Sequence, residues 1–600
     1  MAALPARRIN SAFNRRQSTR RAAARPARSI EVTNLALPTR QPNPELAQEL
    51  RREFEAVRAI RYNWEPYWSD IAYRILPHQN VFMRSMLGTP QAERRTEYIF
   101  DSTAPQALDD CAAAFEAMLF PRTQKWHKLI PTDPDLKDNR TIRAYLEDVN
   151  DALFAARYSP KANFASQAHE NMLGLVAFGT GSLFVDEKVG EHIRYRAIPL
   201  QDLYFAETHV GVIERVYRQF LFNSIQAVEQ WGIDGVPAVV KAKYDNPAQR
   251  YQDLEWLHVV RPRKDYSPGR ADGQGMPLES VYMFLPNSSA GENGIVEIGG
   301  YRTMPYATSR YIVGPREVYG RSPSMTNLAD IKMLNEMSRT DINASQLMTF
   351  PPVLLPEAGT SFALRPGAMN YGMVTDDGKP LAHPFEVGAH VDISEEKMEQ
   401  RRKSIRSGYM GSIFQMLTDH PDMTATQALL IAQERGILIT PVMGRQQSEF
   451  LGVCIARELD ILAHAGQLPE MPPELMERGG QIKIEYSSPL NLLQRAQDGV
   501  GILNTFQQLA PMAEAGHPEV FDVFDPAATA RELAEINGVP AKVLRDADQV
   551  AQIQQQKAQA ANAQALVQAA PQAAAAAKDL ATAHSTMQNL PQAPPVGAQQ

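Results

Sequence analysis

The residues from Thr424 to about His464 constrain the fold of this chain most, because they favour one helix far longer than globular domains usually contain. Thr424 and Gln427 have capping-box spacing, in which the Thr hydroxyl and the Gln side chain satisfy free backbone donors at a helix start. Pro441 removes one backbone donor and crowds the preceding turn, so we expect a kink there. About 40 helical residues extend about 60 Å, which is typical of an extended scaffold or of a helix that packs against another subunit.

The first half of the chain has helical and strand-like patterns. Apolar residues recur every three or four positions from Pro44 to Ile60, and an alanine-rich run extends from about Pro105 to Leu119, so we expect a helix in each. Between about 125 and 320, short strand-like runs alternate with Gly, Pro and Asn turns. The expected strands are Gly181–Val185, Ile193–Ile198, Val212–Phe222 and Trp256–Arg261. This segment is therefore an α+β region.

Helical patterns dominate after residue 320. Ser322 and Pro323 form a good helix start, as an N-cap followed by proline at the first helical position, and this helix must stop before Pro351. A charged helix is expected from about 394 to 407. Helical sequence runs again from Asn491 to about Gln559, and disorder is expected beyond residue 570, where alanine, glutamine and proline prevail.

The charge of the chain is unevenly distributed. Residues 1–40 hold nine arginines and one acid, Glu31, for a net charge of +8, whereas the other 560 residues carry −15. The basic leader has no apolar periodicity and predicts a disordered arm, although a transit peptide has a similar composition. An acidic body is the opposite of the basic surface that neutralises phosphates in ordinary nucleic-acid-binding domains, so any contact that it makes with DNA should be loose.

The sequence lacks the motifs of the common catalytic, cofactor and metal sites. It contains no P-loop and no G-x-S-x-G, and the glycines at Gly179 and Gly181 lead into a strand-like run rather than a helix. Leu173 stands where a second histidine would complete a zinc motif begun by His169. Twelve histidines without ligand spacing predict surface and turn positions. We expect no enzyme activity, cofactor or metal.

Two further observations limit the class of protein. The only cysteines, Cys111 and Cys454, lie far apart, which excludes a disulfide framework and a thiolate zinc site and favours a reducing, intracellular setting. No stretch reaches the roughly 18 apolar residues of a membrane span. Asp419, His420 and Asp422 resemble a catalytic group, but neighbouring side chains in a proline-bounded loop rarely converge on one atom, so we interpret them as a polar loop before a helix.

Four blocks, in this order along residues 45–545, resemble one known family. They are Phe100–Ala104 with Trp126–Leu129, Gly211–Arg218, Tyr319–Pro323 with Leu328–Lys332 and Leu334–Asn335, and Met423–Gln427 with Glu434, Pro441, Gly444–Arg445 and Glu449. The chain resembles the head-to-tail connector, or portal, proteins of short-tailed bacteriophages.

The resemblance implies an α+β subunit with an α/β wing, a helical stem, a small β-containing clip, a long kinked helix and a helical crown, in a closed ring of about twelve copies. Its implied parts are a disordered arm (1–44), a wing (45–320), a first stem helix (321–349), a clip (350–390), a second stem helix (391–410), a tunnel loop (411–423), a long kinked helix returning to the wing (424–484), a crown (485–570) and a disordered tail (571–600).

The resemblance also implies a function and three groups of site residues. The ring would stand at one capsid vertex and act as the channel for packaging and ejection of double-stranded DNA, docking the terminase and then tail adaptor proteins. The implied residues are Gln415, Thr418, Asp419 and His420 in the tunnel loop, Lys332, Arg339, Arg402 and Arg406 in the stem, and Arg7, Arg8, Arg15, Arg16, Arg20 and Arg21 in the arm. The charge of the arm favours contacts with capsid protein, scaffold protein or packaged DNA. Assembly would take place in the host bacterial cytoplasm, without a membrane.

Two other classes of protein remain open on the sequence. A nucleic-acid-processing enzyme with a diverged site would bind nucleotides and form a compact, small oligomer. A non-viral scaffold of long helices would form dimers or filaments rather than closed rings.

Overall fold

The computed structural model describes residues 44–557, 559–560 and 578, apart from 80–81, 83–96, 123, 138, 189–191, 271, 287–293, 355–362, 364, 366–367, 372, 382, 385–390, 411–440, 487–488, 515–520, 522, 537–538, 540–542 and 546–548. The helices are α1 Pro44–Arg61, α2 Glu65–Arg74, α3 Thr103–Leu119, α4 Arg140–Arg157, α5 Phe164–Phe178, α6 Ser224–Trp231, α7 Ala238–Asp245, α8 Pro323–Thr349, α9 Val391–Gly408, α13 Gly452–His464, α14 Pro473–Glu477, α15 Pro489–Glu514 and α16 Pro526–Ile536. The strands are β1 His127–Pro131, β2 Thr180–Lys188, β3 His192–Ile198, β4 Leu203–Glu207, β5 Ile213–Asn223, β6 Asp253–Pro262, β7 Leu278–Phe284, β8 Ile295–Tyr301, β9 Tyr306–Arg310, β10 Ile312–Val313, β11 Gly320–Arg321, β12 Val353–Leu354, β13 His383–Pro384 and β14 Ile482–Tyr486.

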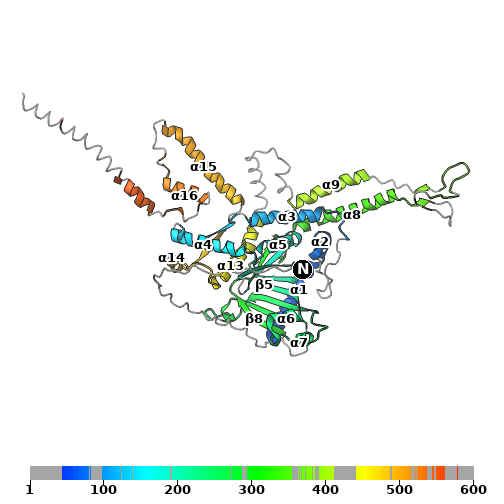
Figure 1. The fold of residues 1–600 in the computed structure, drawn as a ribbon, viewed down its shortest axis with the longest axis horizontal. Helices are drawn as coiled ribbons and strands as arrows, with labels where there is room; N and C mark the ends of the chain where they lie inside the picture. Colours follow the sequence, from blue (N-terminus) through cyan, green and yellow to red (C-terminus); the bar gives the residue numbers. More distant parts are fainter. Residues whose placement is uncertain are drawn as a thin grey trace, which may run out of the picture.

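A body of helices and sheets carries an extended helical hairpin (Figure 1). Helices α8 and α9 lie side by side and project away from the body, with the short β12–β13 ladder at their far end. Helices α15 and α16 lie on the other side of the body. The chain is therefore a mixed helix-and-strand protein with one long projection.

A five-stranded antiparallel sheet, in the order β4–β5–β6–β7–β8, is covered by helices on both faces. Strand β6 places Leu254 and Trp256 in one apolar cluster and Leu257 and Val259 in another, as the alternation of side chains along a strand requires. The first cluster packs under α6 and α7, and the second packs under α1. Both faces of this sheet are thus buried.

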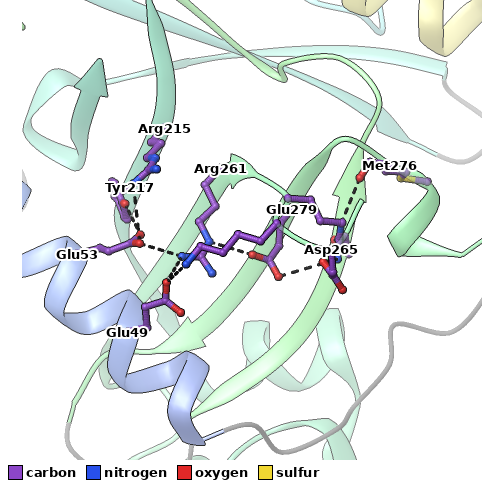
Figure 2. Close-up of polar contacts among 11 residues, drawn as sticks. Glu49, Glu53, Arg215, Tyr217, Arg261, Asp265, Met276 and Glu279 are labelled. Atoms are coloured by element: carbon purple, nitrogen blue, oxygen red, sulfur yellow. Dashed lines mark hydrogen bonds and ion pairs between the residues drawn. The ribbon is translucent and has the colours of Figure 1, made fainter. Parts of the chain in front are cut away.

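Charged side chains hold α1 on its face of the sheet in addition to the apolar contacts (Figure 2). Nη1 of Arg261, from β6, lies 2.9 Å from Oε1 of Glu53 and 3.2 Å from Oε1 of Glu49. The Arg261 Nε donates to Glu279 at 2.9 Å, and the Tyr217 hydroxyl donates to Glu53 at 2.7 Å. Two carboxylates of one helix thus converge on a guanidinium of the sheet.

The largest core joins segments from both ends of the described chain. It contains α3, α4, α5 and α13 together with the three-stranded sheet β3–β2–β9. Strand β1 pairs with β14 in antiparallel register from His127–Tyr486 to Pro131–Ile482. The body therefore becomes complete only when residues near 130 meet residues near 484.

A fully buried ion pair lies inside this core. Arg157, at the end of α4, donates from Nε to Oε1 of Glu458 on α13 at 3.1 Å and makes a second bond from Nη2 to Oε2. Both side chains are completely buried. The Tyr195 hydroxyl donates to the same carboxylate at 2.8 Å, and the Arg157 guanidinium also lies over the ring of Trp126, 4.5 Å from its centroid. The carboxylate of the pair therefore accepts hydrogen bonds from two residues, and the guanidinium packs on an aromatic ring.

His127 completes this network in its neutral form. Its Nε2 lies 3.0 Å from Nη1 of Arg157, which can only donate. Burial and the neighbouring Arg157 charge lower the pKa of His127 to about 2. A neutral ring is therefore the acceptor for the third nitrogen of the guanidinium.

The expected helices and strands named above are confirmed where the structure describes them, except that the helical stretch expected from Asn491 to about Gln559 is interrupted at 524–525 and 544–545. At the first break, Asp525 accepts from the Ala527 backbone and starts a new helix, α16. Helix α8 begins after the Ser322 cap and ends at Thr349, and the Gly179 turn leads into β2 as expected. The expectation that the histidines lie at the surface and in turns is wrong for His127 and His258, which are fully buried. Nε2 of His127 contacts Arg157, and both ring nitrogens of His258 contact hydroxyl groups in the core. Residues 424–440 of the expected long helix lie outside the described residues.

Replacing Arg157 with Met is expected to lower the free energy of unfolding by about 3–5 kcal/mol, because Glu458 is left as a buried, unpaired charge. The double variant R157M/E458L should recover much of this loss, because both charges are removed. Urea denaturation at pH 7 measures both. The control is K125A at the exposed Lys125–Asp151 pair, which should cost no more than about 1 kcal/mol. Equal costs for R157M and K125A would contradict the role given to the buried pair.

Candidate functional site

The α8–α9 hairpin is the candidate site, because it carries all four cations that the sequence placed in the stem. Helix α8 is 27 residues long, and its buried residues end at Ser338. Its first half therefore belongs to the body, and its second half extends beyond it.

The start of α8 is fixed by the end of α5. The Ser322 hydroxyl donates to the Ala177 carbonyl and the Ser324 hydroxyl donates to the Val176 carbonyl, both at 2.8 Å. These carbonyls belong to the last turn of α5, where no helical partner remains for them. Ser322 also accepts from the Met325 backbone at 3.1 Å and so caps its own helix. One residue thus stabilises the ends of two helices.

Two glycines allow this junction to form. Gly179 has φ +81°, and a Cβ atom on Gly320 would lie 2.1 Å from the Gly179 carbonyl oxygen. The backbones of Gly179 and Gly320 are therefore in contact just before the start of α8. Any side chain at Gly320 would force this contact apart.

Helix α9 packs along the first half of α8. Asp330 accepts from Arg401 at 3.1 Å and from the Ser404 hydroxyl at 2.9 Å. At the end of α9, a Cβ atom on Gly408 would lie 2.1 Å from the Asn327 side chain, so only glycine permits this approach. The buried Tyr409 then donates to the Ser324 hydroxyl at 2.7 Å. The two helices are therefore fixed to each other and to the body at their base.

The four predicted stem cations all contact groups of this same chain. Lys332 pairs with Asp70 of α2, and Arg402 lies 2.9 Å from Asp101. Arg406 lies 3.9 Å from Glu399, and the guanidinium of Arg339 lies 5.8 Å from the centroid of the Phe100 ring. Arg339 and Arg402 meet at residues 100–101, whereas Lys332 lies apart at α2. The structure thus gives these side chains a place at the hairpin base, with much of their charge balanced.

Asp101 and Asn335 connect α3 to the hairpin. The Asn335 side-chain oxygen accepts from the backbone of Phe100 at 3.0 Å and of Asp101 at 3.3 Å. Asp101 in turn accepts from the Thr103 backbone at 2.9 Å, at the start of α3. Burial alone would raise the pKa of Asp101, but hydrogen bonds from Thr103 and Arg402 outweigh it and lower the pKa. The charged form of this carboxylate is therefore the one that braces the hairpin.

The other predicted site residues lie outside the described residues. These are Gln415, Thr418, Asp419 and His420 of the expected tunnel loop, and Arg7, Arg8, Arg15, Arg16, Arg20 and Arg21 of the arm.

The second half of α8 exposes apolar side chains. Ile342, Leu347 and Met348 are exposed, and Phe350, at the end of the helix, is 84% exposed. Leu354, Met369 and Tyr371, beyond the helix, are exposed as well. The far half of the hairpin therefore exposes more large apolar side chains than its base does.

A second structural centre was missed by the sequence reasoning. Arg310, at the end of β9, donates to both oxygens of Glu449, at 2.9 and 2.8 Å, and also pairs with Glu207. The same guanidinium donates to the carbonyls of Gly211 at 3.0 Å and Val318 at 3.1 Å. Gly211 and Glu449 belong to two of the blocks that carried the family resemblance, but nothing in the sequence indicated that Arg310 joins them.

One group inside the body resembles a catalytic arrangement. His258 lies 3.0 Å from the Ser280 hydroxyl and 2.7 Å from the Tyr306 hydroxyl. Burial first, and then the Arg218 charge, lower the pKa of His258 well below its usual value. Ser280 and His258 are both buried, so no substrate reaches this hydroxyl, and the group is a polar network between two sheets.

The described part of the chain brings no three His, Cys, Asp or Glu side chains into an arrangement that could hold a metal ion. Within it, every helix is too short or too polar to span a membrane. Cys111 and Cys454 are free and buried.

Comparison with known proteins defines the class. The family described as bacteriophage head to tail connecting protein matches residues 47–544. The chain is 26% identical to the probable portal protein of Bordetella phage BPP-1 over 540 residues, covering 89% of this chain and 95% of that protein. It is also 26% identical to the portal protein of Salmonella phage epsilon15 over 542 residues, covering 88% and 94%. The chain therefore belongs to the bacteriophage head-to-tail connecting protein family.

This membership identifies a structural component of a phage particle, and both curated relatives are named portal proteins. Two solved structures with similarity to this chain contain gene transfer agent particles. A native virion matches with 12% identity, a TM-score of 0.30 and coverage of 69% of this chain and 86% of that chain. A neck computed with C12 symmetry matches with 13% identity, a TM-score of 0.30 and coverage of 71% and 94%.

Acid is expected to weaken the brace between α3 and the hairpin. The pKa of Asp101 is lowered in the folded protein, so its contribution is present above the unfolded value of about 3.9 and is lost as pH falls through the folded pKa. D101N keeps a side chain that can cap α3 but removes the charge. We expect D101N to be less stable than the parent by about 1 kcal/mol at pH 7 and equally stable near pH 2, as measured by chemical denaturation.

D101A is the control for this experiment. It removes the cap as well as the charge, so its stability should be lower at both pH values, by about 0.5–2 kcal/mol for the cap. A D101N deficit that is the same at pH 7 and near pH 2 would contradict the electrostatic account.

Proposed function

We propose that this chain assembles into a closed ring of about twelve copies that forms the DNA channel of a phage capsid vertex. In this proposal, residues 45–320 form the wing, the α8–α9 hairpin forms the stem, and residues 350–390 at its far end form the clip. The C-terminal helices form the crown on the opposite side. Terminase and then tail proteins would dock at the clip, outside the head.

The observation that carries the proposal is the hairpin. Its base is fixed to the body by Ser322, Ser324 and Asn335, whereas its outer half exposes Leu347, Met348 and Phe350. A stable monomer rarely exposes this much apolar surface on a long projection. In a ring, the same surface of each copy would lie against the next copy, so burial repeats around the axis.

The charge of the chain supports a channel through which DNA slides. Each phosphate that a protein neutralises adds a salt-dependent binding term, so a strongly basic wall would hold DNA in place. Beyond residue 40 the chain carries −15, and the stem cations Lys332 and Arg402 are paired with Asp70 and Asp101. The wall would therefore bind DNA weakly.

The native mass of the purified protein tests ring formation. Twelve copies of a 66.8 kDa chain have a mass of about 800 kDa, and negative-stain images of the same fraction should show a central hole. The double variant L347S/F350S should shift the mass toward the monomer, because it removes apolar surface that the ring buries. Light scattering measures both. A filament or a compact tetramer for the parent would overturn the proposal.

Tyr251→Ser is the matched control for the double variant. Tyr251 is also strongly exposed, but it lies between α7 and β6, on the body and away from the hairpin. Its replacement should leave the mass unchanged. If Y251S lowered the mass as much as L347S/F350S does, the loss of any exposed apolar side chain would disturb assembly, and the hairpin would have no special part in it.

The tunnel loop is proposed to narrow the channel around passing DNA through Gln415, Thr418, Asp419 and His420. Shortening residues 411–423 should lower the yield of DNA-filled heads while rings still form. Counting filled and empty heads by electron microscopy gives the result, and filled heads at the parental yield would count against this role.

A further inference from the structure

The helix that runs from Pro441 into α13 contains a π-helical segment, η6, from Gln446 to Leu451. Its wider turn is shown by the Gly452 N–H, which donates to the Gln447 carbonyl five residues earlier instead of four. Segments of this kind are rare and occur frequently at functional sites.

The π-helical turn keeps one face of the helix buried. Val442, Gln446, Phe450, Cys454 and Glu458 recur at every fourth position, and each is buried. In a regular α-helix, each spacing of four residues overshoots a turn by about 40°, so these positions would spiral away from a common face. The wider turn absorbs part of this drift. Val442 before it and Glu458 after it can therefore face the same core.

Arg310 holds this turn from one side. Its guanidinium donates to both oxygens of Glu449, which lies within η6. The Gln446 side chain, also within η6, donates back to the Arg310 carbonyl at 2.8 Å. Arg310 is almost fully buried, so these bonds are little screened by solvent. Arg310, at the end of β9, is thus hydrogen-bonded to two residues of the π-helical turn, Gln446 and Glu449.

Tyr486 holds the turn from β14. Its hydroxyl donates to the Gln447 carbonyl at 2.8 Å, the same carbonyl that accepts from Gly452. A Cβ atom on Gly452 would lie 3.2 Å from that carbonyl oxygen and 3.3 Å from the Tyr486 hydroxyl. A glycine therefore gives this three-way contact the room it needs.

We propose that η6, held by Arg310 and Tyr486, sets the rotational register with which the chain enters this helix at Pro441. Arg310 and Tyr486 are then positioning residues for the first turn of this helix, at Pro441 and Val442. The inference rests on the proposed function only for the assignment of the tunnel loop, residues 411–423, that precedes this helix in the chain. A slip of one residue would turn the entry by about 100° and shift it by about 1.5 Å.

Arg310 also connects this register to the stem. Its Nη1 donates to the Val318 carbonyl at 3.1 Å, two residues before β11 and close to the start of α8. One guanidinium thus contacts both the entry to the stem and the turn that sets the helix register. A shift of η6 should therefore move the backbone at Val318, and a shift at Val318 should move η6.

The test is the thiol reactivity of Val442→Cys in the full-length chain. Val442 is buried, and the two native cysteines are buried as well, so labelling of the folded V442C protein should be slow. Inserting one alanine between Gly444 and Arg445, just before η6, should rotate position 442 by about 100° away from the core, because Arg310 and Tyr486 keep η6 in place. We expect the labelling rate to rise by on the order of tenfold or more.

Two milder changes keep the test decisive if the insertion prevents folding. Y486F removes the hydroxyl that donates to Gln447, and R310Q removes the charge that pairs with Glu449. Each should speed the labelling of V442C. R310K keeps the charge and should restore part of the protection. The matched control is R263Q, since Arg263 is a buried arginine that bonds the Met276 and Gly299 carbonyls elsewhere in the body. Its replacement should leave position 442 protected. Unchanged protection in Y486F and R310Q would overturn the proposal, and so would equal exposure in R263Q.

Light scattering of V442C with no further change separates this inference from the proposed function. If no ring forms but Y486F and R310Q speed labelling, the register inference holds and the portal proposal fails. If rings form and labelling does not respond, the register inference fails and the portal proposal remains.

Discussion

The buried ion pair between Arg157 and Glu458 is the interaction on which the rest of the body depends. It joins α4 to α13 inside the largest core, beside the β1–β14 ladder that joins the same two regions of the chain. A buried pair contributes little net stability compared with apolar residues of similar volume, but losing one partner is costly. Its geometry therefore specifies which helix α13 must pack against. With α13 fixed there, η6 lies beside Arg310, which also contacts the chain just before α8.

The α8–α9 hairpin differs from this body, because only its base is buried. At its base, the α8–α9 hairpin is held by hydroxyl groups, a carboxylate and two close approaches of glycine, all of which require defined geometry. Farther out, its surface is apolar and exposed, with Phe350 at the end of α8. A firm base and an uncovered outer half suit a part whose position is set by the body and whose contacts come from other subunits. This arrangement fixes the angle at which the hairpin leaves the body.

Local features of the fold could be predicted from the sequence because they depend on near neighbours. The Ser322–Pro323 start of α8 and the strands between residues 180 and 262 follow from caps, turns and periodicity. The Arg157–Glu458 and Arg310–Glu449 contacts could not, since 301 and 139 positions separate the partners. The buried histidines were missed for the same reason. The π-helical turn left no apolar repeat in the sequence either, because its buried face includes the polar Gln446 and Glu458.

The distance along the chain between Arg157 and Glu458 also has a consequence during synthesis. A ribosome takes about 15–60 s to make the 301 residues that separate them. Throughout that time the nascent chain holds Arg157 without the carboxylate of Glu458, and strand β1 without its partner β14. Because such edges pair readily with other chains, the unfinished subunit is exposed to misassembly until α13 and β14 emerge. The body is therefore completed late, near residue 486, and a nascent chain that stops short of it lacks the β1–β14 ladder and the Arg157–Glu458 pair.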